Sequence, residues 1–180
     1  MRWLTFAVLA VMALTLQAAA APRLELFAAR PDFLLIVVVF LSLYAPPNDA
    51  IAAAWILGVC ADLMTIERFG LITLSYGLTA MSVTSVRECL FRYRLVTQAA
   101  VTFAACLLVR TAWTVYYHGL YGVTVPLFKD WVVGAVLASI YTAALAPPTF
   151  RVLLPMSRSL GITRPRLDYA GSSSLDRGHV

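Results

Sequence analysis

Two residues of opposite charge lie inside long apolar stretches, Asp62 within segment 50–66 and Arg110 within segment 95–117. If both stretches are helices, Asp62 lies about 18 Å and Arg110 about 22 Å from the start of its helix. A charge at the centre of a membrane costs from about 2.5 to about 17 kcal/mol, so such side chains usually find a partner. These residues predict an ion pair, direct or through water. Two alternatives stay open: separate placement near an interface, and a ligand or proton site.

The remaining polar residues give little sign of catalysis or of a metal site. The two histidines, His118 and His179, stand in no motif that would activate Ser75 or Ser82 as a nucleophile. Metal sites need clustered ligands, and the sequence has none. The cysteines have unrelated spacings and suggest neither a disulfide framework nor a metal site: Cys60, Cys89 and Cys106. We therefore expect no enzyme, no metal and no cofactor.

The composition decides the solvent around these residues. The 180 residues are 61% hydrophobic and 13% charged, with a mean hydropathy of +0.82. Soluble domains have about 25% charged residues, so a bilayer is the expected environment. The net charge of +5 is then first a signal of topology. No basic stripe with interleaved aromatic residues is present, which disfavours nucleic-acid binding.

Six apolar segments approach the length of about 20 residues that a spanning helix needs. They predict an all-α integral membrane protein, folded as one bundle with no second domain. The expected spans are residues 3–21, 28–45, 50–66, 70–86, 95–117 and 131–154, followed by a polar, disordered tail over 156–180.

Prolines and small residues mark several ends of these segments. Pro31 fits the first turn of the second helix, where Asp32 would complement the positive end of the helix dipole. Pro147 and Pro148 predict a break that ends the sixth span near Ala146. The first segment ends in small residues typical of a signal-peptide cleavage site, but its length favours an uncleaved helix.

The basic residues predict that both termini face the cytoplasm. This orientation places nine Lys and Arg residues inside and four outside, in agreement with the positive-inside rule. Asp62 and Arg110 then lie at similar depth, in the outer half of the membrane. Cytoplasmic arginines could bind anionic lipid, at about 1 kcal/mol each near the surface, or an acidic partner. The candidates are Arg87, Arg92, Arg94, Arg151 and Arg158.

Small residues in the third and fourth segments predict close helix packing, because Gly and Ala let membrane helices approach each other. The candidates are Ala54, Gly58, Gly70 and Gly77. They could hold a partner's helix, but we expect packing inside the chain.

The order of features over residues 31–94 resembles the MreD family of bacterial rod shape-determining proteins. A Pro-Asp pair begins an apolar segment, a turn with prolines follows, and the next segment carries Gly58 and Asp62 ahead of a turn at 69–71. The residues Glu-Arg-Phe at 67–69 depart from the small residue and proline that are common in the family. The rest of the chain resembles the family by length and hydropathy.

The resemblance implies a non-enzymatic component of the cell elongation machinery. Such proteins associate with the periplasmic coiled-coil protein MreC. Through it they connect MreB filaments with the RodA glycosyltransferase and its transpeptidase partner. The resemblance also implies a fold similar to the six-helix vitamin-binding subunits of energy-coupling transporters. Arg110 matches no motif of the family.

We therefore expect a multi-pass protein of the bacterial inner membrane that scaffolds or regulates lateral peptidoglycan synthesis and rod shape. The rival hypothesis is a small-molecule binding or transport subunit, in which Asp62 and Arg110 contact a polar ligand inside the bundle. Helices broken near the midplane would favour transport. The prolines fall at span ends, which weighs against that mechanism.

Overall fold

The computed structural model describes residues 3–20, 23, 31–65, 70–87, 95–121 and 128–159. Within these ranges it contains six α-helices and no strand, which confirms the all-α fold class for the described part of the chain. The helices are α1 (Trp3–Ala20), α2 (Phe33–Tyr44), α3 (Pro47–Met64), α4 (Leu71–Val86), α5 (Leu95–Tyr121) and α6 (Phe128–Ser159). They fall on the six segments predicted from the sequence. Most of the predicted tail, residues 160–180, lies outside the described residues.

The short helix α2 lies at the centre of the bundle and contacts each of the other five helices. Every residue from Phe33 to Leu43 is buried, as expected for a helix that is apolar on all sides. The helix begins where the Asp32 side chain accepts the Leu35 N–H. It ends at Tyr44, with Ala45 as its C-cap, just before the consecutive prolines 46 and 47, which cannot continue its hydrogen bonding.

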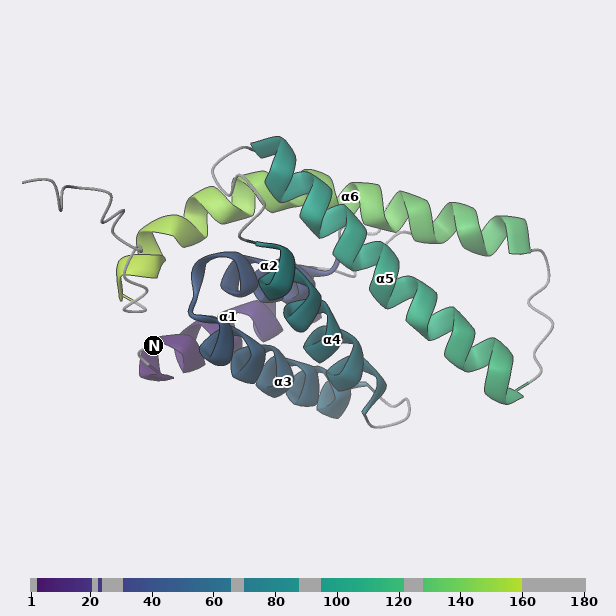
Figure 1. The fold of residues 1–180 in the computed structure, drawn as a ribbon, viewed down its shortest axis with the longest axis horizontal. Coiled ribbons are helices and arrows are strands. Elements are labelled where there is room, and N and C mark those ends of the chain that lie inside the picture. Colours follow the sequence, from purple (N-terminus) through teal and green to yellow (C-terminus); the bar gives the residue numbers. More distant parts are fainter. Residues whose placement is uncertain are drawn as a thin grey trace, which may run out of the picture.

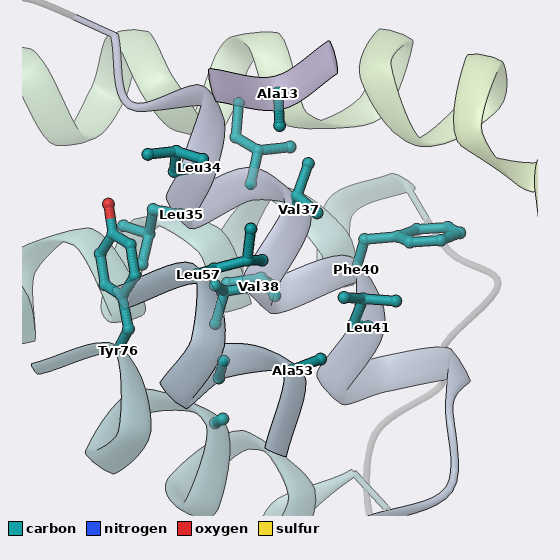
Figure 2. Close-up of a cluster of buried hydrophobic side chains, with 14 of the residues drawn as sticks. Ala13, Leu34, Leu35, Val37, Val38, Phe40, Leu41, Ala53, Leu57 and Tyr76 are labelled. Atoms are coloured by element: carbon teal, nitrogen blue, oxygen red, sulfur yellow. The ribbon is translucent and has the colours of Figure 1, made fainter. Parts of the chain in front are cut away.

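Three other helices supply much of the core around α2. Figure 2 shows the α2 side chains packed between α1, α3 and α4, with the labelled residues Ala13, Leu34, Leu35, Val37, Val38, Phe40, Leu41, Ala53, Leu57 and Tyr76. Phe40 also packs edge-on against Phe150 of α6, with ring centroids 5.4 Å apart. Because lipid is as apolar as these side chains, close packing rather than water exclusion stabilises such a core in a membrane.

Four of the helices pair into two hairpins of different size. α3 and α4 pack closely together, as do α5 and α6. Figure 1 shows α3 along one edge of the molecule and α6 along the opposite edge, with α2 and α4 between them. One end of the α5–α6 hairpin projects beyond the ends of α3 and α4 (Figure 1).

The predicted break at Pro147 and Pro148 is wrong. α6 continues through both prolines and through Pro155 as far as Ser159. The first four residues of the predicted tail, 156–159, therefore belong to a helix. Thr149 donates a hydrogen bond from Oγ1 to the Leu145 carbonyl, 2.6 Å away. The same bond to the carbonyl four residues earlier is made by Ser139 and Thr142 on this helix.

Large apolar side chains are exposed on α1, α3, α4, α5 and α6. Many exposed large apolar side chains are typical of a membrane or interaction surface. Among the described residues, two helices contain stretches long and apolar enough to cross a bilayer, Val96–Trp113 and Val133–Pro155. Three shorter apolar stretches coincide with α1, α2 and α4. That all six helices span the membrane stays a prediction.

Candidate functional site

The Asp62 side chain joins the end of α3 to the start of α4. Asp62 is only 1% exposed. Its carboxylate accepts backbone N–H groups from Gly70 at 3.0 Å, Ile72 at 3.2 Å and Thr73 at 3.0 Å. It also accepts the Thr73 hydroxyl. The first N–H groups of a helix have no partner within that helix, and they carry the positive end of its dipole. Asp62 therefore caps α4 from the preceding helix.

Two glycines make this contact possible. Gly70 precedes α4 with a φ of 104° and provides no side-chain cap, so the cap must come from elsewhere. Gly58 lies four residues before Asp62, on the same face of α3. A Cβ atom at Gly58 would lie 2.5 Å from the Thr73 Cα. The bare backbone at Gly58 thus lets the start of α4 approach closely enough to reach the carboxylate.

A second polar cluster surrounds Asp32 at the start of α2. Tyr76, on α4, donates its hydroxyl to the Asp32 carboxylate, 3.0 Å from each oxygen. The Asp32 N–H donates to Thr142 Oγ1 of α6 at 3.4 Å. The next N–H, of Phe33, donates to Gln17 Oε1 of α1 at 2.8 Å. Four helices therefore meet through hydrogen bonds at the start of the central helix.

Arg110 of α5 belongs to the surroundings of this second cluster. It is half-buried and interacts electrostatically with Asp32 and with Cys106, one turn earlier on α5. The hydrogen bonds described for the Asp62 carboxylate, by contrast, all come from residues 70–73. The direct contact between Asp62 and Arg110 therefore stays a prediction, and the capping of α4 already accounts for the buried Asp62 carboxylate.

Arg87 connects α4 with the end of α2. It follows the last residue of α4, and its Nη1 donates to the Ala45 carbonyl at 2.6 Å. Since Tyr76 reaches the start of α2 and Arg87 reaches its end, α2 and α4 run parallel. Parallel helix dipoles repel each other, so carboxylates at the starts and a cation at the ends offset this cost.

The structure describes only some of the other basic candidates. Arg151 is exposed on α6. Arg158 lies within α6, but its side chain is outside the described residues, as are Arg92 and Arg94 altogether. The contacts of this group with lipid or with an acidic partner stay a prediction.

The small-residue candidates lie at contacts within the chain or at the start of a helix. Ala54 is 1% exposed within the core. A Cβ atom at Gly77 would lie 2.7 Å from the Trp55 ring, so α3 and α4 touch there as they do at Gly58. Gly70 has open space around its missing side chain, and its positive φ is the reason for a glycine there.

Sequence reasoning missed the roles of Tyr76 and Thr73. Each is a polar residue in an apolar helix, which signals a hydrogen-bond partner but does not say which one. Among the described residues, no group of three or more His, Cys, Asp or Glu side chains could hold a metal ion. The arrangement joins helices through capping contacts and hydrogen bonds.

The model of the rod shape-determining protein MreD family matches residues 1–154. The chain belongs to the MreD family. This confirms the resemblance seen over residues 31–94 and extends it to the first, fifth and sixth helices. No curated protein and no solved structure matches the chain, so the likeness of this MreD-family fold to vitamin-binding subunits stays an expectation. Family membership suggests a role in rod shape determination and agrees with the helical membrane character of the chain.

Proposed function

We propose that this protein is a non-enzymatic inner-membrane scaffold that directs lateral peptidoglycan synthesis and so maintains rod shape. It would act in a complex with MreC, MreB, RodA and the transpeptidase partner of RodA. The family match over residues 1–154 carries this proposal, because it includes α1 to α5 and most of α6. The family is shape-determining and is not known for catalysis.

The use of the polar side chains supports a scaffold role. Asp62 caps α4, Arg87 joins α4 to α2, and Asp32 joins α2 to α4 and α6. These contacts hold helices in fixed relative positions, and a scaffold needs such positions to present partners in one arrangement. The same hydrogen bonds occupy the Asp62 carboxylate, which the rival hypothesis assigns to a ligand.

The proposal includes a six-span topology with both termini in the cytoplasm. Reporter fusions test this arrangement directly. Alkaline phosphatase, which is active only outside the cytoplasm, should be active when inserted at 66–69 or 122–127 and inactive at the C-terminus. A fluorescent protein fused to the C-terminus should give the converse result. Active phosphatase at the C-terminus would exclude this topology.

Depletion of the protein in its native bacterium tests the function. We expect wider or rounded cells with dispersed or stalled lateral wall incorporation, scored by a fluorescent D-amino acid. A plasmid copy should restore rod shape, and an Asp62→Asn copy should restore it less well at equal protein level. Normal width and normal incorporation after full depletion, in a strain with no second copy, would contradict the scaffold role.

One observation favours the rival, a small-molecule binding or transport subunit. Asp32, Tyr76 and the half-buried Arg110 gather at the start of the central helix, and clustered charges in a membrane protein often mark a ligand path. If depletion leaves shape unchanged, purified protein should be screened with polar ligands by thermal shift. A ligand whose stabilisation is lost in Arg110→Ala would favour this function.

A further inference from the structure

The two consecutive prolines of α6 remove the hydrogen-bond donors that one backbone carbonyl needs. In an α-helix the Ala144 carbonyl would accept the N–H of residue 148, or that of residue 147 in a tighter 3₁₀ turn. Both residues are prolines, which have no N–H. The Ala143 carbonyl differs, because Ala146 still offers an N–H for a 3₁₀ bond. Ala144 is therefore the carbonyl that loses both of its usual donors.

Neighbouring groups do not replace these donors. Thr149 donates its hydroxyl to the Leu145 carbonyl, and in an α-helix its N–H is directed at the same carbonyl. Thr142, on the preceding turn, donates to the Ala138 carbonyl. Within the described part of the chain, no side chain and no other helix donates to the Ala144 carbonyl. An unsatisfied backbone group is costly in lipid, so a donor from outside the chain would be stabilising.

The Ala144 carbonyl lies at an exposed position and at a depth where lipid offers no donor. Ala144 and Pro148 are both exposed, and a proline ring clashes with the carbonyl four residues before it, which keeps the turn open there. Ala144 comes eleven residues after Val133 and seven before the exposed Arg151, which is about 16 Å and about 10 Å along the helix. With α6 spanning the membrane, these distances place the carbonyl within the hydrocarbon core.

The exposed residues of α6 around this carbonyl form one face, which we call the Ala144 face. They recur at intervals of three or four residues along one side of the helix. The face consists of Leu137, Ile140, Ala144, Pro148 and Val152. Ala144 is the small residue in its middle, and small residues let a second membrane helix approach the backbone. Because α6 lies along one edge of the molecule (Figure 1), a partner can reach this face from the lipid.

We propose that the Ala144 face binds a membrane helix of another protein, which donates a hydrogen bond from a side-chain hydroxyl or amide to the Ala144 carbonyl. Arg151 is exposed two turns later on the same side of α6. An acidic residue of the partner, about 10 Å nearer the cytoplasm than its donor, would face this arginine and fix the register.

A second copy of this chain is a poor source of the donor. The exposed serine and threonine hydroxyls of the described residues already donate to carbonyls of their own helices. They are Thr15, Thr65, Ser82, Ser85 and Thr111. The inference rests on the proposed scaffold function and on its six-span topology, and it gives that scaffold a site for one partner.

Photocrosslinking in the native bacterium tests the proposal, together with a substitution that supplies the missing donor. A photoreactive amino acid replaces Ile140, which is 52% exposed, and crosslinked peptides are identified by mass spectrometry. Pro148→Ala restores an N–H four residues after Ala144, so α6 then satisfies this carbonyl itself. Pro155→Ala, at another exposed proline of the same helix, is the matched control. It restores a donor for the Arg151 carbonyl and leaves Ala144 unchanged.

We expect the crosslinked peptide to come from a membrane-spanning segment of another protein that contains a Ser, Thr, Asn or Gln side chain. Its yield should fall by about threefold or more in Pro148→Ala, as expected for the loss of one hydrogen bond between membrane helices. The yield should stay unchanged in Pro155→Ala. Equal yields in the two variants would overturn the proposal, as would a crosslink to a second copy of this chain or adducts with lipid alone.

Ala144→Leu provides a second test that leaves both prolines in place. The larger side chain blocks the close approach of a partner, so the crosslink yield should fall here too, while thermal unfolding in detergent checks that the variant is folded. A yield equal to that of the unmodified protein would contradict the proposal. Failure of the scaffold function would appear instead in the depletion experiment, and an incorrect topology in the phosphatase fusions, so these failures are distinguishable.

Discussion

Asp32 and Asp62 each place a carboxylate at the start of a helix, but over different distances along the chain. Asp32 is the N-cap of its own helix and accepts the N–H of Leu35, three residues later. Asp62 belongs to α3 and caps the next helix, with N–H donors eight to eleven residues later. The first cap is local, whereas the second requires α3 and α4 to be packed together.

The two caps also differ in what remains when the carboxylate is removed. At the start of α2, Gln17 still accepts the Phe33 N–H. At the start of α4, Asp62 accepts every hydrogen bond described for the Gly70, Ile72 and Thr73 N–H groups. This comparison predicts that α4 depends more strongly on a single side chain than α2 does. The following variants test that ranking.

Asp62→Ala should have the largest effect, a loss of about 3–5 kcal/mol in unfolding free energy. The substitution leaves three backbone N–H groups without their partner, at about 1–3 kcal/mol each with partial relaxation. Unfolding in mixed detergent micelles with rising dodecyl sulfate measures the loss. The neighbouring Leu63→Ala, at a position 65% exposed, is the control and should change stability by less than about 1 kcal/mol. Equal losses of unfolding free energy in both variants would contradict the capping role of Asp62.

The predicted contact between Asp62 and Arg110 is tested by adding Arg110→Ala to this series. A direct contact should give a coupling energy of about 0.5–3 kcal/mol in the double-mutant cycle. If the losses of the two single variants simply add, Asp62 caps α4 without contacting Arg110. Coupling of Arg110→Ala with Asp32→Ala instead would assign the arginine to the α2 cluster.

Asp32→Ala should cost less, about 2–3 kcal/mol, because the Leu35 N–H and the Tyr76 hydroxyl lose their acceptor while Gln17 still accepts the Phe33 N–H. Tyr76→Phe removes only the hydroxyl and should cost about 1 kcal/mol. Both are measured by the same unfolding assay. If Asp32→Ala were as damaging as Asp62→Ala, the contrast between the local and the distant cap would fail.

Gly58→Ala should cost about 1–3 kcal/mol, because the new methyl group meets the backbone at Thr73 and forces α3 and α4 apart. Gly134→Ala on α6 is the matched control. No atom lies within 4 Å of a Cβ there, so this change should be neutral or slightly stabilising. Thermal unfolding in detergent distinguishes the two. A Gly58→Ala protein as stable as the control would show that the close approach is not needed for the Asp62 cap.

Arg87→Lys should have the smallest effect, a loss of about 1 kcal/mol, since lysine keeps the charge but cannot reproduce the planar guanidinium. The exposed Arg151→Lys is the control and should change stability by less than about 0.5 kcal/mol. Thermal unfolding of both proteins at equal concentration measures the difference. A larger loss of stability for Arg151→Lys would show that the cation that stabilises the fold lies on α6 and not at the end of α4.

Much of the fold could be predicted because apolar segment length is a property of the chain alone. The six helices, the place of Asp32 at the start of α2 and the family followed from such local patterns. The expectation that Pro31 lies in the first turn is wrong, because α2 begins at Phe33 with Asp32 as its N-cap. The continuation of α6 through Pro147 and Pro148 could not be predicted from these patterns. A proline removes one backbone donor, and its neighbours decide whether the helix tolerates the loss. Here Phe150, two residues after Pro148, is fully buried among α2 side chains.

The sequence by itself determined that Asp62 would need partners, because a carboxylate in an apolar segment is costly wherever that segment lies. It also placed Gly58 one turn before Asp62, on the same helical face. Only the tertiary structure decided that the partners of Asp62 are the first N–H groups of α4. That choice depends on how closely two helices approach and where the second one begins. These distances arise from packing and are not encoded in the spacing of charges along the chain.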